Sequence, residues 1–277
     1  MKNERVQKFR FVKNDNLQYH FFSAGKIFST RLVHRPGICV HASWIYDGAV
    51  TEISRSEKLW VQSDTDFMDI SSDILSVRDL DGELNIIAKF KDGRNCFHAK
   101  VKPQNILKWM DTYAESNDEV LHLPDLIGTL EYKGKVYPTF GYCKHVQWQS
   151  APRYTGYRFL HGIIGDEQIP VWSADAVFGY QKYDYFKMIE DKGEVTVADR
   201  ELSSHKQNTI YAKVGDRNIT VSFEELGSWE MPLINDRTDM VIQQRYGNIT
   251  YREGDIVKSG VAMTEYGFGK YGDNSIG

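Results

Sequence analysis

Apolar and polar residues alternate over long stretches of the chain, which is the pattern of β-strands with one buried face. In residues 84–90 every second residue, starting from Leu84, is apolar. Asp-Gly pairs stand at 81–82 and 92–93. This pair is favoured in tight hairpin turns because both central positions need a positive φ. Residues 74–101 are therefore predicted to form a three-stranded antiparallel meander.

The second half of the chain repeats this alternation between regularly placed turn signals. Predicted hairpins cover residues 185–198, 209–223 and 240–252, and a last strand covers residues 256–266. Many short strands separated by turns are typical of an antiparallel barrel or sandwich. The sequence therefore predicts an all-β fold.

A single stretch has helical rather than strand spacing. Its apolar residues Ile106, Trp109, Met110 and Tyr113 fall at i, i+3, i+4 and i+7. Residues at this spacing lie on one face of an α-helix. We therefore expect one short helix near residues 104–115.

Glycine, proline and tyrosine are concentrated between residues 124 and 182. Glycine and proline interrupt regular structure, so strands are predicted to end, cross over and begin again there. The many aromatic residues of this stretch indicate ordered structure rather than a linker. We expect two domains of the same style, residues 1–140 and residues 141–277, that meet near residues 130–180.

The composition excludes several classes of function. The net charge of −4 over 277 residues does not favour a nucleic-acid partner, because phosphate binding needs clustered Lys and Arg. The eight histidines and the cysteines Cys39, Cys96 and Cys143 show no metal-ligand spacing, so neither a metal nor another cofactor is expected. The chain has no apolar run of about 18 residues and no apolar segment behind its basic N-terminus. We therefore expect no membrane span and a cytoplasmic location.

The richest candidate for chemistry is residues 140–148, with the sequence FGYCKHVQW. On a strand, Tyr142 and Trp148 share one face and His145 lies on the other with Cys143. His145 has a reference pKa that suits proton transfer, so it is a candidate general acid or base. The alternative is a core histidine that is hydrogen bonded by the backbone. Tyr157 follows shortly after as a further aromatic candidate for binding.

Two more groups of residues suggest a site. His161 is expected to lie across from the strand that carries Trp172 and Asp175, and an Asp that orients a His is a familiar catalytic arrangement. Glu265, followed by Tyr266, has the parity of two apolar neighbours on its strand, so an interior face would make it a buried carboxylate with a raised pKa. The alternatives are ordinary packing for the first group and a salt bridge to an Arg for Glu265.

These residues resemble a known family. Residues 140–148 are similar to the G-Y-x-E-H-x-W-G segment at the midpoint of tandem lipocalin-like proteins, which include carotenoid 1,2-hydratases (hydroxyneurosporene synthases), AttH-like proteins and natural-product cyclases such as decalin-forming Diels–Alderases. Residues 79–101 resemble the first-barrel meander, residues 183–193 the opening hairpin of the second barrel, and residues 260–269 its last strand. Lys144 stands where the family often has an acid, and Gln149 where it often has Gly.

The resemblance implies two lipocalin-like antiparallel β-barrels and an apolar ligand, often a polyene, in or between them. It also implies chemistry without a metal or organic cofactor. We therefore expect a cyclase, isomerase or hydratase of a polyene, terpenoid or polyketide, in which His145 or Glu265 moves a proton. The expected substrate-binding residues are Tyr142, Trp148, Tyr157, His161, Trp172, Asp175 and Tyr266. A non-catalytic carrier of the same ligands and a carbohydrate-active β-protein remain the alternatives.

Overall fold

The structure is a computed structural model that describes residues 14–35, 38–58, 70–71, 73–104, 107–110, 119–148, 154–165, 169–178, 181–189, 195–197, 204–206, 208–235 and 238–270. All regular secondary structure within these ranges is β-strand, and every strand pair is antiparallel. The predicted all-β fold is therefore confirmed. None of the described segments forms a helix long and apolar enough to cross a membrane.

The contacts within the chain divide it into two units, Met1–Ala151 and Pro152–Gly277. The boundary that we expected after residue 140 falls inside the strand Lys135–Trp148, which pairs on both sides with strands of the first unit. The two units are described separately below.

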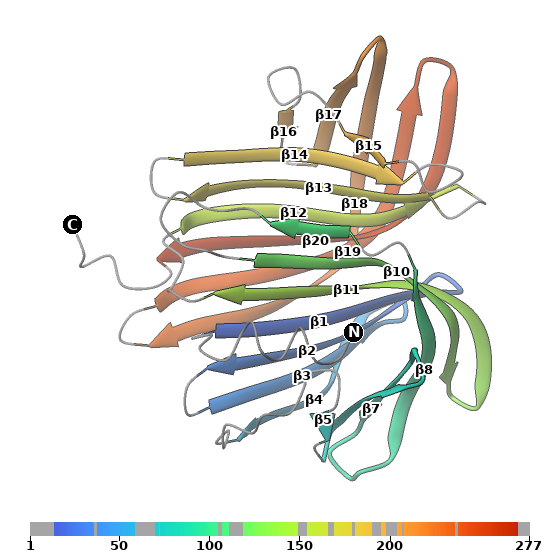
Figure 1. The fold of residues 1–277 in the computed structure, drawn as a ribbon, viewed down its shortest axis with the longest axis vertical. Coiled ribbons are helices and arrows are strands. Elements are labelled where there is room, and N and C mark those ends of the chain that lie inside the picture. The colour runs from blue at the N-terminus through green and yellow to red at the C-terminus, as the bar shows by residue number, and fades with distance from the viewer. Residues whose placement is uncertain are drawn as a thin grey trace. The chain divides into compact units, whose positions relative to one another are not determined.

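The first unit is built on one sheet, coloured blue to light green in Figure 1. Its described strands run in the order β4-β3-β2-β1-β11-β10-β8-β7-β6-β5, and β9 pairs with β10. The predicted meander at residues 74–101 is confirmed as β6, β7 and β8. The strand bounds are β1 Asn14–Ser23, β2 Lys26–Arg35, β3 Ile38–Tyr46, β4 Val50–Lys58, β5 Ile70–Ser71, β6 Leu75–Leu80, β7 Glu83–Lys89, β8 Asn95–Gln104, β9 Leu107–Met110, β10 Glu119–Tyr132 and β11 Lys135–Trp148.

The helix expected near residues 104–115 is wrong where the structure describes that range. Residues 107–110 form the strand β9, which pairs with residues 119–122 of β10. Trp109 stands opposite Val120 in this pairing. The apolar spacing that favours a helix continues over only two turns, so the local preference for a helix is weak. The hydrogen bonds that these four residues form with the neighbouring strand outweigh that preference.

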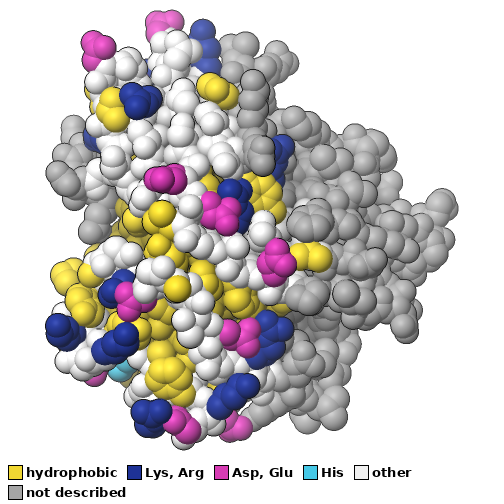
Figure 2. Space-filling model, turned by 180° about the vertical axis from the view of Figure 1, so that it is seen from behind, with side chains coloured by type: hydrophobic (Ala, Val, Ile, Leu, Met, Phe, Trp, Pro, Cys, Tyr) yellow, Lys and Arg dark blue, Asp and Glu magenta, His cyan; other side chains and the backbone are white. Residues whose placement is uncertain are grey.

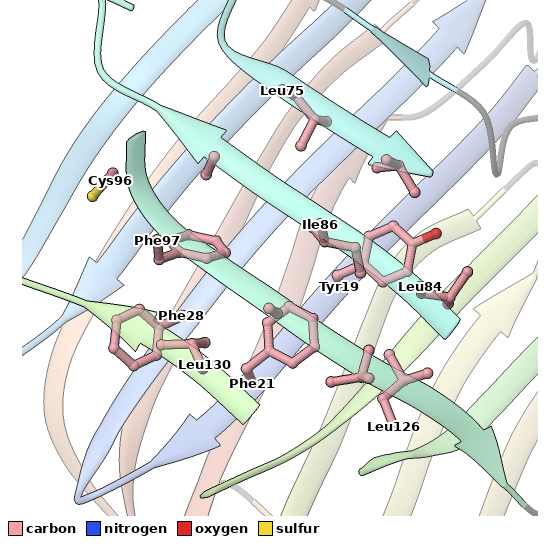
Figure 3. Close-up of a cluster of buried hydrophobic side chains, with 14 of the residues drawn as sticks. Tyr19, Phe21, Phe28, Leu75, Leu84, Ile86, Cys96, Phe97, Leu126 and Leu130 are labelled. Carbon is pink, nitrogen blue, oxygen red and sulfur yellow. The ribbon is translucent and has the colours of Figure 1, made fainter. Parts of the chain in front are cut away.

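The core of the first unit is an apolar cluster enclosed by its curled sheet (Figure 3). Phe21, Phe28 and Phe97 belong to it, and Phe97 meets both other rings edge to face, with centroid distances of 6.4 and 5.5 Å. Cys143 is fully buried in the same cluster. Burial also raises the pKa of the Cys96 thiol to about 11, so this cysteine is predominantly a neutral thiol near neutral pH.

The second unit is built on another sheet, whose described strands run in the order β15-β14-β13-β12-β20-β19-β18-β17-β16 (Figure 1). Its longest pairs are β18 with β19 and β19 with β20. The strand bounds are β12 Tyr154–Ile164, β13 Ile169–Phe178, β14 Gln181–Ile189, β15 Val195–Val197, β16 Ser204–Lys206, β17 Thr209–Val214, β18 Arg217–Asn235, β19 Thr238–Glu253 and β20 Ile256–Lys270.

One face of this second sheet carries its own apolar core. Leu160 of β12, Ile249 and Tyr251 of β19, and Ala262 of β20 belong to it, together with Phe223 of β18. Alternation along each strand then places the residues between them on the opposite face. That opposite face carries the candidate site described below.

The surface carries charges of both signs. On the face seen in Figure 2, hydrophobic side chains gather in the lower half, and Lys and Arg side chains stand among Asp and Glu side chains around them. Such mixing agrees with the small net charge of −4. Among the described residues of the first unit, Val136 and Leu80 are the most exposed large apolar side chains.

An ion pair joins the ends of β18 and β19. The Arg217 guanidinium donates to both carboxylate oxygens of Glu253, with distances of 2.7 and 2.9 Å, and the Tyr251 hydroxyl donates to the same carboxylate. The hydrogen bonds from Arg217 are the main reason that the pKa of Glu253 is lowered. Burial, followed by the bond to Glu253, raises the pKa of Tyr251 to about 12.

This lowered pKa predicts a pH-dependent contribution to stability. A carboxyl whose pKa is lower in the folded chain than in the unfolded chain stabilises the fold above its unfolded pKa, and the contribution is lost as pH falls through the folded pKa. We expect Glu253→Gln to reduce the free energy of unfolding by about 1 kcal/mol at pH 7. Urea unfolding should show this difference shrinking below about pH 4. A difference that stays constant down to pH 2 would contradict the assignment.

Candidate functional site

The candidate site lies on the face of the second sheet that points away from its apolar core. Strand register places Gln244 of β19 directly opposite Glu265 of β20, and Trp229 of β18 opposite Gln244. The next row on this face runs from Tyr246 through Met263 to His161. Directly opposite residues on one face have Cβ atoms about 4.5–5.5 Å apart, so each row places its residues side by side.

Glu265 is a buried carboxyl group with a defined partner. Its side chain is 1% exposed, and the Gln244 Nε2 donates to its Oε2 at 2.7 Å. The Tyr246 hydroxyl in turn donates to the Gln244 Oε1 at 3.2 Å. Gln244 and Tyr246 are themselves fully buried. The prediction that Glu265 occupies a buried face is therefore confirmed, and the Gln244 amide is one of its hydrogen-bond partners.

His161 is the second titratable residue on this face. It is 1% exposed and stands opposite Met263 on β20, diagonal to Glu265. Its partner on β13 is Trp172, so the predicted pairing of His161 with this stretch is confirmed. Residues on such a diagonal are about 7–8 Å apart at Cα, within reach of long and aromatic side chains. Tyr157 has the same parity on β12 and stands opposite Gly267.

Asp175 and Tyr266 occupy the other face of the sheet. Asp175 pairs with Arg158, whereas His161 pairs with Trp172. Asp175 and Trp172 are three positions apart on one strand, so Asp175 lies on the opposite face of the sheet from His161. The Tyr266 ring lies 5.0 Å from the Arg245 guanidinium, which also lies over the Phe223 ring at 5.2 Å. Neither residue is brought beside Glu265.

Arg245 is held firmly on that core face. Its Nε donates to Glu225, and its Nη1 donates to the Asn208 side-chain oxygen at 3.0 Å. Two aromatic contacts and two hydrogen bonds thus hold the Arg245 guanidinium on the core face of the second sheet. Alternation along β19 therefore separates the charged Arg245 from the neutral pair Gln244 and Tyr246.

In the first unit, the histidine beside Tyr142 is His20. The two residues stand opposite each other on β11 and β1, with ring centroids 5.0 Å apart, and the Trp44 ring lies 6.3 Å from His20. His20 Nε2 lies 3.3 Å from the Gln18 Oε1, and His20 Nδ1 lies 2.7 Å from the Ser29 Oγ. An amide oxygen only accepts, so Nε2 carries a hydrogen, and in the neutral ring Nδ1 then accepts from the Ser29 hydroxyl.

His145 and Trp148 lie on β11 but their side chains are outside the described part of the structure. His145 pairs with Leu17 on one side and Leu121 on the other. It has the parity of Cys143, which is buried in the core, while Trp148 has the parity of Tyr142. The strand on which the predicted parity of Tyr142 and His145 depends is therefore present.

The residues that sequence reasoning missed are His20, Gln244 and Tyr246. The alternation in β1 places Gln18 and His20 on one face, which is a weak signal. Their contacts come from pairings between distant segments, such as His20 with Tyr142. Among the described residues, no group of three or more His, Cys, Asp or Glu could hold a metal ion.

Comparisons with known proteins identify the fold but no close relative. No protein-family model matches the chain, and no curated protein sequence matches it. Kievitone hydratase from Nectria haematococca superposes with a TM-score of 0.63 at 8% identity, over 94% of this chain and 90% of that one. An AttH-like protein from Nitrosomonas europaea gives 0.55 at 10% identity, over 92% and 93% of the two chains. CghA gives 0.63 at 7% identity, over 94% and 89%.

These matches extend over nearly the whole chain. They confirm the predicted fold of tandem lipocalin-like barrels and the resemblance to AttH-like proteins at the level of fold. Identities of 10% or less carry no residue roles from those proteins to this chain.

Proposed function

We propose that this chain, which has the fold of AttH-like proteins and of a hydratase, is a cofactor-independent cyclase, isomerase or hydratase. Its substrate would be a hydrophobic polyene, terpenoid or polyketide in an apolar pocket. The observation that carries the proposal is the buried Glu265 carboxyl, which stands among Trp229, Met263 and Tyr246 on one sheet face. A titratable group inside an apolar, aromatic surface is the usual make-up of a site for proton transfer.

One carboxyl group is sufficient for all three reactions. In an isomerisation or cyclisation, Glu265 takes a proton from one atom of the substrate, and a proton is returned at another atom, so the substrate keeps its composition. In a hydration, a proton and a hydroxyl from one water add across a double bond, and the carboxyl group ends in its starting form. Trp and Tyr rings beside the carboxyl would stabilise positive charge that develops on carbon.

The residues proposed to bind the substrate differ in where they lie relative to Glu265. Tyr157, His161 and Trp172 occupy the face that carries Glu265, so these three are the strongest candidates. Tyr142 and Trp148 share a face of the first sheet, and His145 is retained as a second proton-transfer candidate. Asp175 and Tyr266 stand on the opposite face to Glu265, which argues for a supporting role there.

The main alternative is a carrier that binds the same class of ligand without converting it. It is favoured by His20, whose two ring nitrogens both have side-chain partners inside the protein, as in a structural histidine. A carbohydrate-active protein is less well supported. It requires two carboxylates that flank the bound sugar, whereas register places Asp175 and Glu265 on opposite faces of the sheet.

The proposal is tested in two steps. The protein is purified from its native host and denatured, and its organic extract is analysed by mass spectrometry, where a stoichiometric apolar compound is expected. The protein is then incubated with that compound in D₂O. An enzyme of the proposed kind yields a product of unchanged composition or with one added water, and it incorporates deuterium from the solvent. A bound compound that is recovered unchanged and without deuterium would establish the carrier instead.

A further inference from the structure

We propose that Gln244 and Tyr246 are positioning residues that hold Glu265 as a carboxylate, so that its first act is to take a proton. This inference rests on the proposed function, because it names the starting form of the same acid/base group. It is carried by the two consecutive hydrogen bonds from Tyr246 to Gln244 and from Gln244 to Glu265.

The two hydrogen bonds have one direction. The Gln244 Nε2 can only donate, and it meets the Glu265 Oε2 at 2.7 Å. The Gln244 Oε1 can only accept, so the Tyr246 hydroxyl donates to it across 3.2 Å. The chain therefore ends on Glu265 as an acceptor, and a donor aimed at a carboxylate stabilises its charged form.

Tyr246 matters because the side-chain amide of Gln244 could also rotate by about 180°, which exchanges the positions of its oxygen and nitrogen. In this rotated state the amide oxygen would face the Glu265 Oε2. Two hydrogen-bond acceptors would then repel each other unless the carboxyl group carried a proton. The rotated amide would therefore favour the acid form of Glu265. By donating to the Gln244 Oε1, the Tyr246 hydroxyl favours the state in which the amide nitrogen faces Glu265. The charge of Glu265 is thus linked to a hydroxyl that does not touch it.

Other titratable groups near Glu265 are few within the described part of the second unit. On its face, β12 contributes His161 and Tyr157 at the two diagonal positions and β19 contributes Tyr246, while β18 contributes the neutral Trp229. The charged pair of Arg245 with Glu225 stands on the opposite face. Gln244 is a neutral group that donates a hydrogen bond directly to the carboxylate.

The test is an infrared titration of the full-length protein, because protonated and ionised carboxyl groups absorb at different frequencies. Subtracting the spectra of Glu265→Gln isolates the signal of Glu265 without any substrate. We expect Gln244→Met, which keeps the side-chain length but removes the donor, to raise the midpoint of the Glu265 titration by about 1–2 pH units. Tyr246→Phe should raise it by a smaller amount, because the amide nitrogen is still present.

Tyr251→Phe is the matched control. It removes a hydroxyl from the same strand that also donates to a carboxylate, Glu253, but on the core face. It should leave the Glu265 midpoint unchanged. If Gln244→Met does not fold, Tyr246→Phe still decides the question, because it removes a single oxygen atom.

Two outcomes would overturn the inference. One is a wild-type Glu265 that stays protonated at neutral pH. The other is a midpoint that Tyr246→Phe moves no more than Tyr251→Phe does. Both are distinguishable from failure of the proposed function, since the titration reads the carboxyl group without a substrate and the D₂O experiment reads the substrate alone.

Discussion

Replacing Glu265 with Gln is expected to reduce turnover of the compound recovered from the protein by about 10²–10⁴-fold, the usual contribution of a general acid or base. The amide keeps the shape of the carboxyl group and retains an oxygen that can accept from the Gln244 Nε2. Binding of the ligand and thermal stability should therefore change little, while deuterium incorporation falls with turnover. The measurement compares kcat and KM of the two proteins at one pH.

The surface pair of Glu230 and Gln243 provides a matched control for this substitution. There the Gln243 Nε2 donates to the Glu230 Oε1 at 3.0 Å between β19, the strand that carries Gln244, and β18, but in an exposed position. Glu230→Gln should leave turnover unchanged. If Glu265→Gln retained full turnover, Glu265 would not be the proton-transfer group, and His145 would become the residue to substitute next.

Much of the fold could be predicted because alternation and turn signals are local properties of the sequence. The meander at residues 74–101 follows directly from apolar residues at every second position between Asp-Gly turns. The stretch at residues 107–110 could not be predicted in this way. Its apolar spacing matches a short helix equally well, and only the partner strand β10 decides in favour of β-structure.

The candidate site was predictable in part for the same reason. Glu265 shares the parity of Met263, so its burial follows from the pattern of a single strand. Its partner Gln244 is different, because nothing local to β19 indicates which residue of β20 it will face. That contact depends on the register between the two strands, which places Gln244 opposite Glu265. His20 was missed likewise, since its partner Tyr142 is more than a hundred residues away in the sequence.

The largest expected effect on stability comes from Phe97, a buried residue of the first core (Figure 3). Its side chain is 1% exposed and meets the rings of Phe21 and Phe28 edge to face. Phe97→Ala removes these contacts and leaves a cavity that the surrounding strands of a curled sheet can fill only in part. We expect the free energy of unfolding in urea to fall by about 3–5 kcal/mol, a large fraction of the ~5–15 kcal/mol typical of a folded protein.

Phe90 is the matched control, because it precedes the hairpin turn that leads into β8, the strand of Phe97, but is itself 36% exposed. The Arg94 guanidinium lies over its ring at 5.5 Å. Phe90→Ala removes the same atoms without opening a cavity, so its cost should stay below about 1 kcal/mol. Equal losses for the two substitutions would contradict the packing of Phe97. A loss confined to Phe97→Ala would instead show that the aromatic cluster enclosed by β1, β2 and β8 stabilises the sheet that carries Tyr142 and His20.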